Sequence, residues 1–261
     1  MSRVSERRKI NENKIMELNE KIVLVTGASK GIGKATAVAF AKEGCSVVIN
    51  FKSDSKAAQS VLEECNRHSK GNAIIAADVS KEKEVSEMCE KIKKQFSHLD
   101  LVINNAGTFD DNDSPTNIEA FDNIYRNNFL SCVMVTKYSL PLMKQGKIIN
   151  VSSIHGRLGH GRPSAIAYSA FKAALENYTK NLAKELAPEI LVNAIAPGRV
   201  ATPMWGNPDE KEQAELGQAH LIKRMIQPEE IADGIVFLAK NDAMCGEVLT
   251  VDGGMGLVTL G

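Results

Sequence analysis

A tyrosine and a lysine four positions apart are the residues of this sequence best suited to proton transfer. Tyr168 and Lys172 lie in a stretch with helical character, and positions i and i+4 share one face of a helix. A phenol has a pKa of about 10 and is a poor base near neutral pH, but a nearby ammonium group favours its ionised form. The pair therefore predicts a tyrosine tuned for general acid and base catalysis.

Two more polar side chains could serve the same chemistry. Ser153 directly follows an apolar run, and its hydroxyl could hydrogen-bond a substrate oxygen on which negative charge develops. Asn128 lies within a long helical stretch. Taken singly, each residue would equally suit a turn or a helix cap.

A glycine-rich turn separates the first apolar run from the first helical stretch. Gly27, Gly31 and Gly33 would let the backbone turn tightly and approach a pyrophosphate, which would sit on the free amides of the helix start. Such a turn can also be a matter of chain geometry alone, and its spacing is wider than that of the common dinucleotide-binding fingerprint.

The apolar runs alternate with helical stretches along the whole chain, as in a parallel sheet covered by helices. The pattern predicts an α/β fold: a single doubly wound Rossmann-type domain over residues 18–261, with a seven-stranded parallel sheet and helices on both faces. Residues 1–17 are expected to form a polar N-terminal extension. Strands are expected at 22–25, 46–51, 72–78, 99–104, 147–152, 190–196 and 247–251. Helices are expected at 31–42, 55–69, 81–96, 117–143 and 165–187, and from Pro228 onward.

The composition argues for a small-molecule partner. Lys plus Arg equals Asp plus Glu at 32 each, which gives no electrostatic footprint for nucleic acid or an anionic membrane. No apolar run approaches the roughly 18 residues that span a bilayer, so no membrane association is expected. The five cysteines include no Cys-x-x-Cys pair, which predicts neither a disulfide framework nor a metal site and favours a cytoplasmic location.

From about Leu18 to Gly254, the chain resembles the short-chain dehydrogenase/reductase family, and most closely its 3-oxoacyl-[acyl-carrier-protein] reductases. The resemblance rests on the glycine spacing, on Asn-Asn-Ala-Gly at 104–107, on Pro-Gly at 197–198 and on the order of the polar residues. It implies an NADP(H)-dependent enzyme that transfers a hydride between nicotinamide and a ketone or secondary alcohol, with a 3-oxoacyl thioester as one candidate substrate. The implied catalytic set is Asn128, Ser153, Tyr168 and Lys172.

The resemblance also assigns roles within this set. Ser153 would steady the carbonyl oxygen and Tyr168 would protonate it. Lys172 would hold the cofactor ribose and lower the pKa of Tyr168. Asn128 would bend its helix and hold a water molecule that links Lys172 to solvent.

The expected cofactor is NADP(H), preferred over NAD(H). An acidic residue that binds the ribose 2′-hydroxyl of NAD normally ends the second strand, and here the residue is Asn50. Lys30 and Lys52 could pair with a 2′-phosphate, although each would equally suit a solvated surface. Asp78 and Asn105 could also be structural residues that cap a turn and join strands. The implied cofactor contacts are Gly27, Ser29, Lys30, Gly31, Ile32, Gly33, Asn50, Lys52, Ser53, Asp78, Val79, Asn105, Ala106, Gly107, Tyr168, Lys172, Pro197, Gly198, Val200 and Thr202.

Two other classes of protein remain open from the sequence: a non-catalytic NADP(H)-sensing protein and a nucleotide-dependent transferase. The complete catalytic set favours the enzyme. The sequence departs from carrier-protein reductases where basic docking residues are expected, since Pro188 and Glu189 stand in one such region. Residues 203–224 are expected to form a substrate lid. Polar or charged residues of the loop before Tyr168 could contact the substrate or simply face solvent: His155, Arg157, His160 and Arg162. The resemblance implies a homotetramer or homodimer.

Overall fold

One parallel sheet organises the chain. The computed structural model describes residues 16–157, 164–206 and 208–258. Seven strands pair in the order β3-β2-β1-β4-β5-β6-β7, and every neighbouring pair is parallel. The predicted fold class is confirmed. The strands are β1 (Ile22–Val25), β2 (Ser46–Phe51), β3 (Ala73–Ala76), β4 (Leu101–Asn104), β5 (Gly146–Val151), β6 (Ile190–Pro197) and β7 (Val248–Val251).

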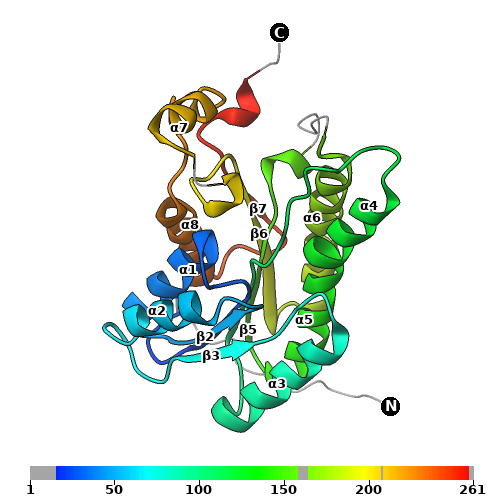
Figure 1. The fold of residues 1–261 in the computed structure, drawn as a ribbon. Helices are drawn as coiled ribbons and strands as arrows, with labels where there is room; N and C mark the ends of the chain where they lie inside the picture. The colour runs from blue at the N-terminus through cyan, green and yellow to red at the C-terminus, as the bar shows by residue number, and fades with distance from the viewer. Residues whose placement is uncertain (1–15, 158–163, 207, 259–261) are drawn as a thin grey trace.

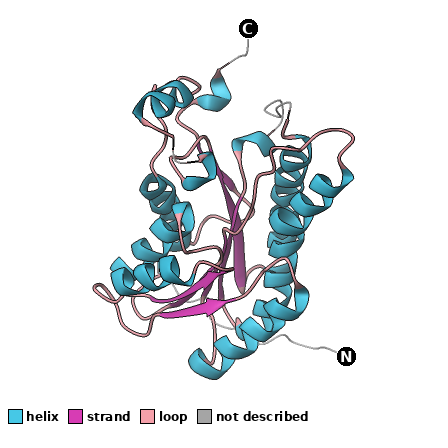
Figure 2. Ribbon diagram, in the orientation of Figure 1, coloured by secondary structure: helices cyan, strands magenta, loops and turns pink. Residues whose placement is uncertain are grey.

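Helices cover both faces of the sheet (Figure 1). α1, α2 and α8 pack on one face, and α3, α5 and α6 pack on the other, where α4 leans against α6. Figure 2 shows the strands as an inner layer between these two helical layers. The α-helices are α1 (Gly31–Lys42), α2 (Ser55–Cys65), α3 (Glu82–Phe96), α4 (Ile118–Tyr125), α5 (Ser131–Ser139), α6 (Ile166–Leu186), α7 (Glu210–Gly217) and α8 (Pro228–Lys240).

The strand order creates a crevice at the carboxyl edge of the sheet. The chain runs outward from β1 to β3 and then crosses to β4, which pairs with β1 on its other side. The loops that follow β1 and β4 therefore leave the sheet in opposite directions, and a ligand can enter between them.

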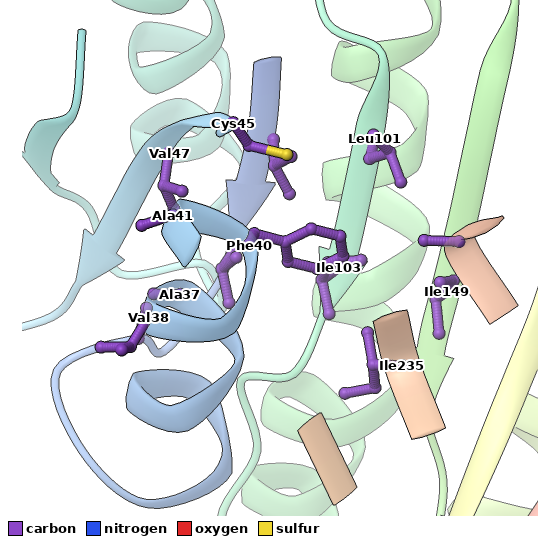
Figure 3. Packing of buried hydrophobic residues seen from close by; sticks show 14 of the residues in the cluster. Ala37, Val38, Phe40, Ala41, Cys45, Val47, Leu101, Ile103, Ile149 and Ile235 are labelled. Carbon is purple, nitrogen blue, oxygen red and sulfur yellow. The ribbon is translucent and has the colours of Figure 1, made fainter. Parts of the chain in front are cut away.

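Two apolar clusters hold the layers together, one on each face of the sheet. In the first, the fully buried ring of Phe40 points from α1 toward Ile103 of β4 (Figure 3). Ile235 of α8 belongs to the same cluster, so α1 and α8 share one core with the sheet. In the second, Met88 and Ile92 of α3 are fully buried with Val102 and Ile148 of the sheet.

The expectation of one helical element over 117–143 was wrong in detail: the stretch is interrupted, and one interruption lies at Asn128, where the resemblance had implied a bend. The segment contains α4, a π-helical turn (η1, Arg126–Leu130), α5 and a 3-10 turn (η2, Leu140–Leu142). A π-turn accommodates one extra residue and shifts the helix face. Here it turns the Asn128 side chain inward, where that residue is only 1% exposed.

α7 lies inside the expected lid segment, where no helix had been predicted. Its start is a capping box: Glu212 N donates to Asp209 Oδ1 at 2.8 Å, and Asp209 N donates to Glu212 Oε2 at 2.9 Å. The signal was present in the sequence as an Asp followed three residues later by a Glu. 3-10 turns complete the described structure: η3 (Ile154–Gly156), η4 (Pro203–Trp205) and η5 (Met255–Leu257).

Within the described ranges, no helix has both the length and the apolar character required to cross a bilayer.

Replacing Phe40 tests whether the first cluster carries the fold. Phe40→Ala should lower the free energy of unfolding by about 3–5 kcal/mol, because it removes a fully buried ring and leaves a cavity between α1 and the sheet. Phe40→Leu, which retains most of the volume, should cost clearly less. Urea unfolding of the three proteins measures this difference, and equal losses for Ala and Leu would contradict the packing argument.

Candidate functional site

The glycine turn after β1 brings bare backbone to the crevice. Gly27 and Gly31 have φ angles of +61° and +56°, which favour glycine. A Cβ on Gly33 would collide with the Gly27 carbonyl oxygen and would lie 2.5 Å from Asn105 Nδ2. α1 begins here with no acidic residue in its first turn and with no cap bond from the Lys30 side chain within the described structure. The turn therefore fits a dinucleotide: the surface lacks side chains, and the amides of a helix start face it.

Thr26 and Asn105 lock this turn to the end of β4. Thr26 Oγ1 accepts hydrogen bonds from the amides of Asn105 and Ala106, both at 3.0 Å. Asn105 Nδ2 donates to the carbonyls of Thr26 and Gly27 at 2.9 and 3.2 Å. The structural reading of Asn105 thus has direct support. The sequence analysis missed Thr26, although a hydroxyl residue beside the first glycine was visible.

Asn50, at the end of β2, points into the protein. Its Oδ1 accepts from the Gly27 amide at 3.2 Å, and its Nδ2 donates to the Ala77 carbonyl at 3.1 Å. Asn50 is 1% exposed, and its bond to the Gly27 amide helps to fix the glycine turn from inside the protein. The next acid along the chain, Asp54, caps α2 by accepting from the Ala57 amide at 2.9 Å.

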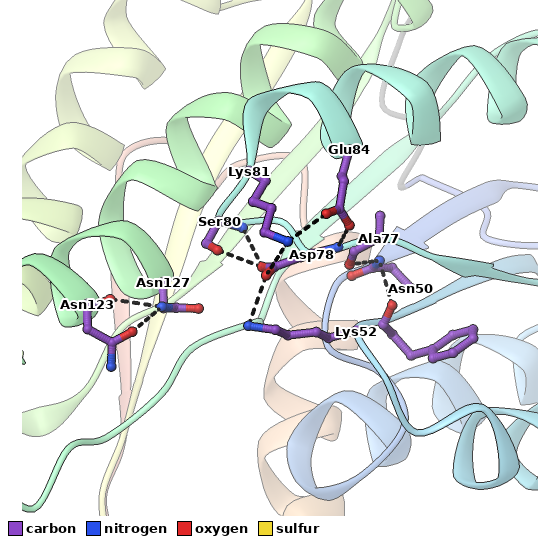
Figure 4. Close-up of polar contacts among 10 residues, drawn as sticks. Asn50, Lys52, Ala77, Asp78, Ser80, Lys81, Glu84, Asn123 and Asn127 are labelled. Carbon is purple, nitrogen blue, oxygen red and sulfur yellow. Dashed lines mark hydrogen bonds and ion pairs between the residues drawn. The ribbon is translucent and has the colours of Figure 1, made fainter.

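A cation and a carboxylate meet beside this strand end (Figure 4). Lys52 Nζ lies 2.9 Å from Asp78 Oδ2, and Ser80 donates through both its hydroxyl and its amide to Asp78 Oδ1. Burial alone would raise the pKa of Asp78, but the hydrogen bonds from Ser80 and Lys52 outweigh it and bring the pKa below its ordinary value. Asp78 is therefore ionised at neutral pH, and Lys52, whose side chain is 63% exposed, remains accessible to an incoming anion.

Asn128 is held from three directions inside the π-turn. Its Nδ2 donates to the carbonyls of Thr108 and Ile124 at 2.9 and 3.1 Å, and its Oδ1 accepts from the Thr108 amide at 3.3 Å. A Cβ on Gly107 would lie 2.6 Å from Asn128 Oδ1 and 3.7 Å from Lys172 Nζ. Gly107 thus permits the loop after β4 to approach both side chains.

Lys172 places a buried cation next to Tyr168. Its ammonium donates to the Val151 carbonyl at 2.8 Å and lies 5.6 Å from the centroid of the Tyr168 ring. Lys172 is 4% exposed. The Phe109 and Tyr168 rings form a T-shaped pair, with centroids 5.7 Å apart. The arrangement joins Tyr168, Lys172, Asn128 and Gly107 in one region, as the sequence predicted for the first three.

Ser153 leaves the end of β5 in extended backbone and is 6% exposed. Its Oγ accepts from the His155 amide at 3.2 Å, which leaves the hydroxyl proton available to a substrate oxygen. The turn that follows packs tightly on α6, since a Cβ on Gly156 would lie 2.7 Å from the Lys172 carbonyl carbon. Gly156, which the sequence analysis did not single out, thus allows the turn after Ser153 to lie directly against Lys172.

The segment after β6 closes the crevice opposite the glycine turn. A Cβ on Gly31 would meet the Thr202 side chain at 3.2 Å, so the two segments touch. His220, which is buried and which the sequence analysis missed, accepts the Arg199 amide on Nε2 at 3.0 Å. Other predicted cofactor residues lie on or near the same edge of the sheet: Ser29, Ile32, Ser53, Val79, Ala106, Pro197, Gly198 and Val200.

The loop before α6 is only partly described. Arg157 Nη1 donates to the Val248 carbonyl at 3.3 Å and lies 3.9 Å from Glu176 Oε2, so Arg157 is tied to β7 and α6. Burial raises the pKa of Glu176, and the Arg157 charge partly offsets this effect. His160 and Arg162 lie outside the described residues. Among the residues that are described, no group of three or more His, Cys, Asp or Glu is arranged to hold a metal ion.

Comparisons with known proteins place the chain in a family. The family model described as "Enoyl-(Acyl carrier protein) reductase" matches residues 27–256. The chain is 38% identical over 246 residues to a 3-oxoacyl-[acyl-carrier-protein] reductase of Synechocystis, which covers 91% of this chain and 98% of that protein. It is 34% identical over 250 residues to general stress protein 39 of Bacillus subtilis, covering 93% of this chain and 87% of that protein.

A solved structure agrees. The crystal structure of a Burkholderia xenovorans protein described as a short-chain dehydrogenase/reductase superposes with a TM-score of 0.83 at 31% identity, and covers 92% of this chain and 99% of that one. The predicted resemblance is confirmed: the chain belongs to the short-chain dehydrogenase/reductase family of oxidoreductases, whose members act on small molecules with a nicotinamide cofactor.

Proposed function

We propose that this protein is an NADP(H)-dependent reductase that interconverts a ketone and a secondary alcohol, with a 3-oxoacyl thioester as the first substrate to test. The observation that carries the proposal is the buried Lys172 ammonium, 5.6 Å from the Tyr168 ring and next to Gly107 and Asn128. A thioester substrate is supported by the 38% identity to the Synechocystis 3-oxoacyl-[acyl-carrier-protein] reductase.

Ser153 and Tyr168 act on the substrate oxygen in different ways. The chemistry that a reduced nicotinamide supplies, when bound, is hydride donation to the carbonyl carbon. Ser153 donates a hydrogen bond to the carbonyl oxygen and stabilises the negative charge that develops there. Tyr168 gives its phenolic proton to the same oxygen, and the reverse reaction returns it.

Lys172 and Asn128 support that proton transfer. The Lys172 ammonium lies 5.6 Å from the centroid of the Tyr168 ring, close enough for its charge to act on the proton transfer. The Val151 carbonyl holds the ammonium at 2.8 Å, which keeps its remaining N–H groups available for a cofactor ribose. The Asn128 side chain, which Thr108 fixes, lies beside Gly107 close to Lys172, where Asn128 would help to hold a water molecule that links Lys172 to solvent.

The preference for NADP(H) is supported by the charges at the end of β2. Asn50 stands at the position of the acid that binds the NAD ribose, and Asp54 is engaged as the cap of α2. Lys52 is exposed and is held only by a carboxylate at its tip, so its ammonium can turn to a 2′-phosphate. Lys30 is a second cation at the glycine turn.

Replacing Lys52 tests the cofactor preference. Lys52→Ala should lower kcat/KM for NADPH by about tenfold or more and leave the value for NADH within about twofold, because only NADPH carries the phosphate that the ammonium would bind. Lys83→Ala, which removes an exposed lysine of α3, is the matched control and should change neither value. Equal losses with both cofactors in Lys52→Ala would contradict the assignment.

Removing one hydroxyl tests the proton donor. Tyr168→Phe should lower turnover by at least about a thousandfold, because no other group at the site replaces the phenolic proton. NADPH binding, followed by fluorescence of the reduced nicotinamide, should stay within about twofold of the wild type. A Tyr168→Phe protein with substantial turnover would rule out this mechanism.

The absorbance of reduced nicotinamide gives the direct assay. NADPH consumption with a 3-oxoacyl thioester supports the proposed substrate, and consumption with simple ketones alone moves the substrate elsewhere within the family. If NADPH binds and no carbonyl compound is reduced, the proposal fails in favour of a protein that senses the cofactor without turnover.

A further inference from the structure

The loop between β4 and α4 carries a buried acid that neither the catalytic set nor the cofactor contacts include. Asp113 is 3% exposed. Its Oδ1 accepts the amide of Ala167 at 3.0 Å, and its Oδ2 accepts the amide of Tyr168 at 3.0 Å. Two carboxylate oxygens on two successive amides fix both the position and the rotation of the backbone that carries Tyr168.

We propose that Asp113 is a positioning residue for the proton donor: it fixes the start of α6 and thereby holds Tyr168 at the site. This inference rests on the proposed function. Asp113 touches no reacting atom, so it acts only through Tyr168.

The start of α6 needs an external acceptor. The first amides of a helix have no partner within the helix. The N-cap residue, Ala165, has no side-chain oxygen, and the first turn contains no acid. Asp113 supplies both acceptors from 54 and 55 positions earlier in the chain, and its negative charge also suits the positive end of the helix dipole.

The same loop fixes the other parts of the site. Thr108 bonds Asn128 through both its amide and its carbonyl, and the Phe109 ring forms a T-shaped contact with the Tyr168 ring. The loop is itself fixed, since Asp113 N donates to the Asp110 carbonyl at 3.1 Å and Asn123 of α4 donates to Asp110 Oδ2 at 3.3 Å. Residues 108–113 therefore align Asn128, the Tyr168 ring and the Tyr168 backbone with one another.

Loss of Asp113 should consequently affect turnover more than binding. The cofactor turn after β1 is held by Thr26, Asn50 and Asn105, none of which contacts Asp113 in the described structure. A small displacement of a group that transfers a proton lowers the rate strongly. Asp113→Asn keeps one acceptor oxygen for the two amides, and Asp113→Ala keeps none.

The experiment compares kcat, KM and NADPH affinity in these two variants. The expected kcat is about tenfold lower in Asp113→Asn and about a hundredfold lower in Asp113→Ala, with KM and the Kd for NADPH within about threefold of wild type. Asp100→Asn is the matched control. Asp100 is also buried and also accepts a backbone amide, from Ile22 at 2.9 Å, but it lies at the opposite, amino edge of the sheet. It should lower Tm and leave kcat near wild type.

A double variant separates positioning from general loss of structure. If Asp113 acts through Tyr168, adding Asp113→Asn to Tyr168→Phe should lower the residual turnover by less than about twofold. A full tenfold further loss in the double variant overturns the inference, as does an Asp113→Asn protein with the kcat of the wild type. A wild type without turnover overturns the proposed function together with this inference, whereas an active wild type with an unaffected Asp113→Asn variant overturns the inference alone.

Discussion

The site depends on the burial of one ammonium group. Burying a charge is costly unless it is hydrogen-bonded or paired, and Lys172, at 4% exposure, meets that requirement with the Val151 carbonyl at 2.8 Å. That bond joins α6 to the end of β5. A shift of the helix along the sheet would break the bond and leave the buried ammonium without this hydrogen-bond partner. Because Tyr168 lies one turn before Lys172, the bond also sets the distance between the phenol and the cation. The close packing around Lys172 also requires two glycines. A Cβ on Gly107 would press on Asn128 beside Lys172, and a Cβ on Gly156 would strike the Lys172 backbone.

The two halves of the sheet carry different parts of the candidate site. The glycine turn, Asn50, Lys52 and Asp78 follow β1, β2 and β3, whereas the side chains proposed for catalysis come from the end of β5 and from the helices on the other half. The halves meet where β1 pairs with β4. There the Thr26 hydroxyl oxygen accepts hydrogen bonds from two amides of the loop after β4. Neighbouring parallel strands fix this contact, so a turn that suits a dinucleotide is held against the loop that contacts Asn128 and Tyr168. The pairing of β1 with β4 thereby sets the position of the glycine turn relative to the loop after β4.

The sequence predicted the parts of the molecule that depend on local pattern. The seven strands and the helices that cover them follow from apolar periodicity, and the pairing of Tyr168 with Lys172 follows from their helical spacing. The place of Asn128 beside them was implied only by the family resemblance. The π-turn over Arg126–Leu130 could not be derived in this way, because one extra residue interrupts the helical period at a single place and the short stretches on either side still have an ordinary helical pattern. Asp113, Thr26 and His220 escaped notice for another reason: each bonds a segment 21 to 80 residues away. The orientation of Asn50 escaped notice too, since only the folded register shows that its amide is used inside the protein.

Residues 208–224, part of the segment expected to form a lid, are tied to the part of the crevice that faces the glycine turn. His220 accepts the Arg199 amide at 3.0 Å, and the Arg199 guanidinium donates to the Leu216 carbonyl at 3.2 Å and lies 5.8 Å from the Trp205 ring centroid. Burial lowers the pKa of His220, which keeps the imidazole neutral and Nε2 able to accept that bond. A Cβ on Gly198 would lie 2.9 Å from the same nitrogen, so Gly198 and His220 are too closely packed for a side chain at position 198. The segment after β6 and α7 thus share one anchor. A displacement of α7 must therefore either break these bonds or carry Arg199 with it, which ties the position of α7 to that of the segment after β6.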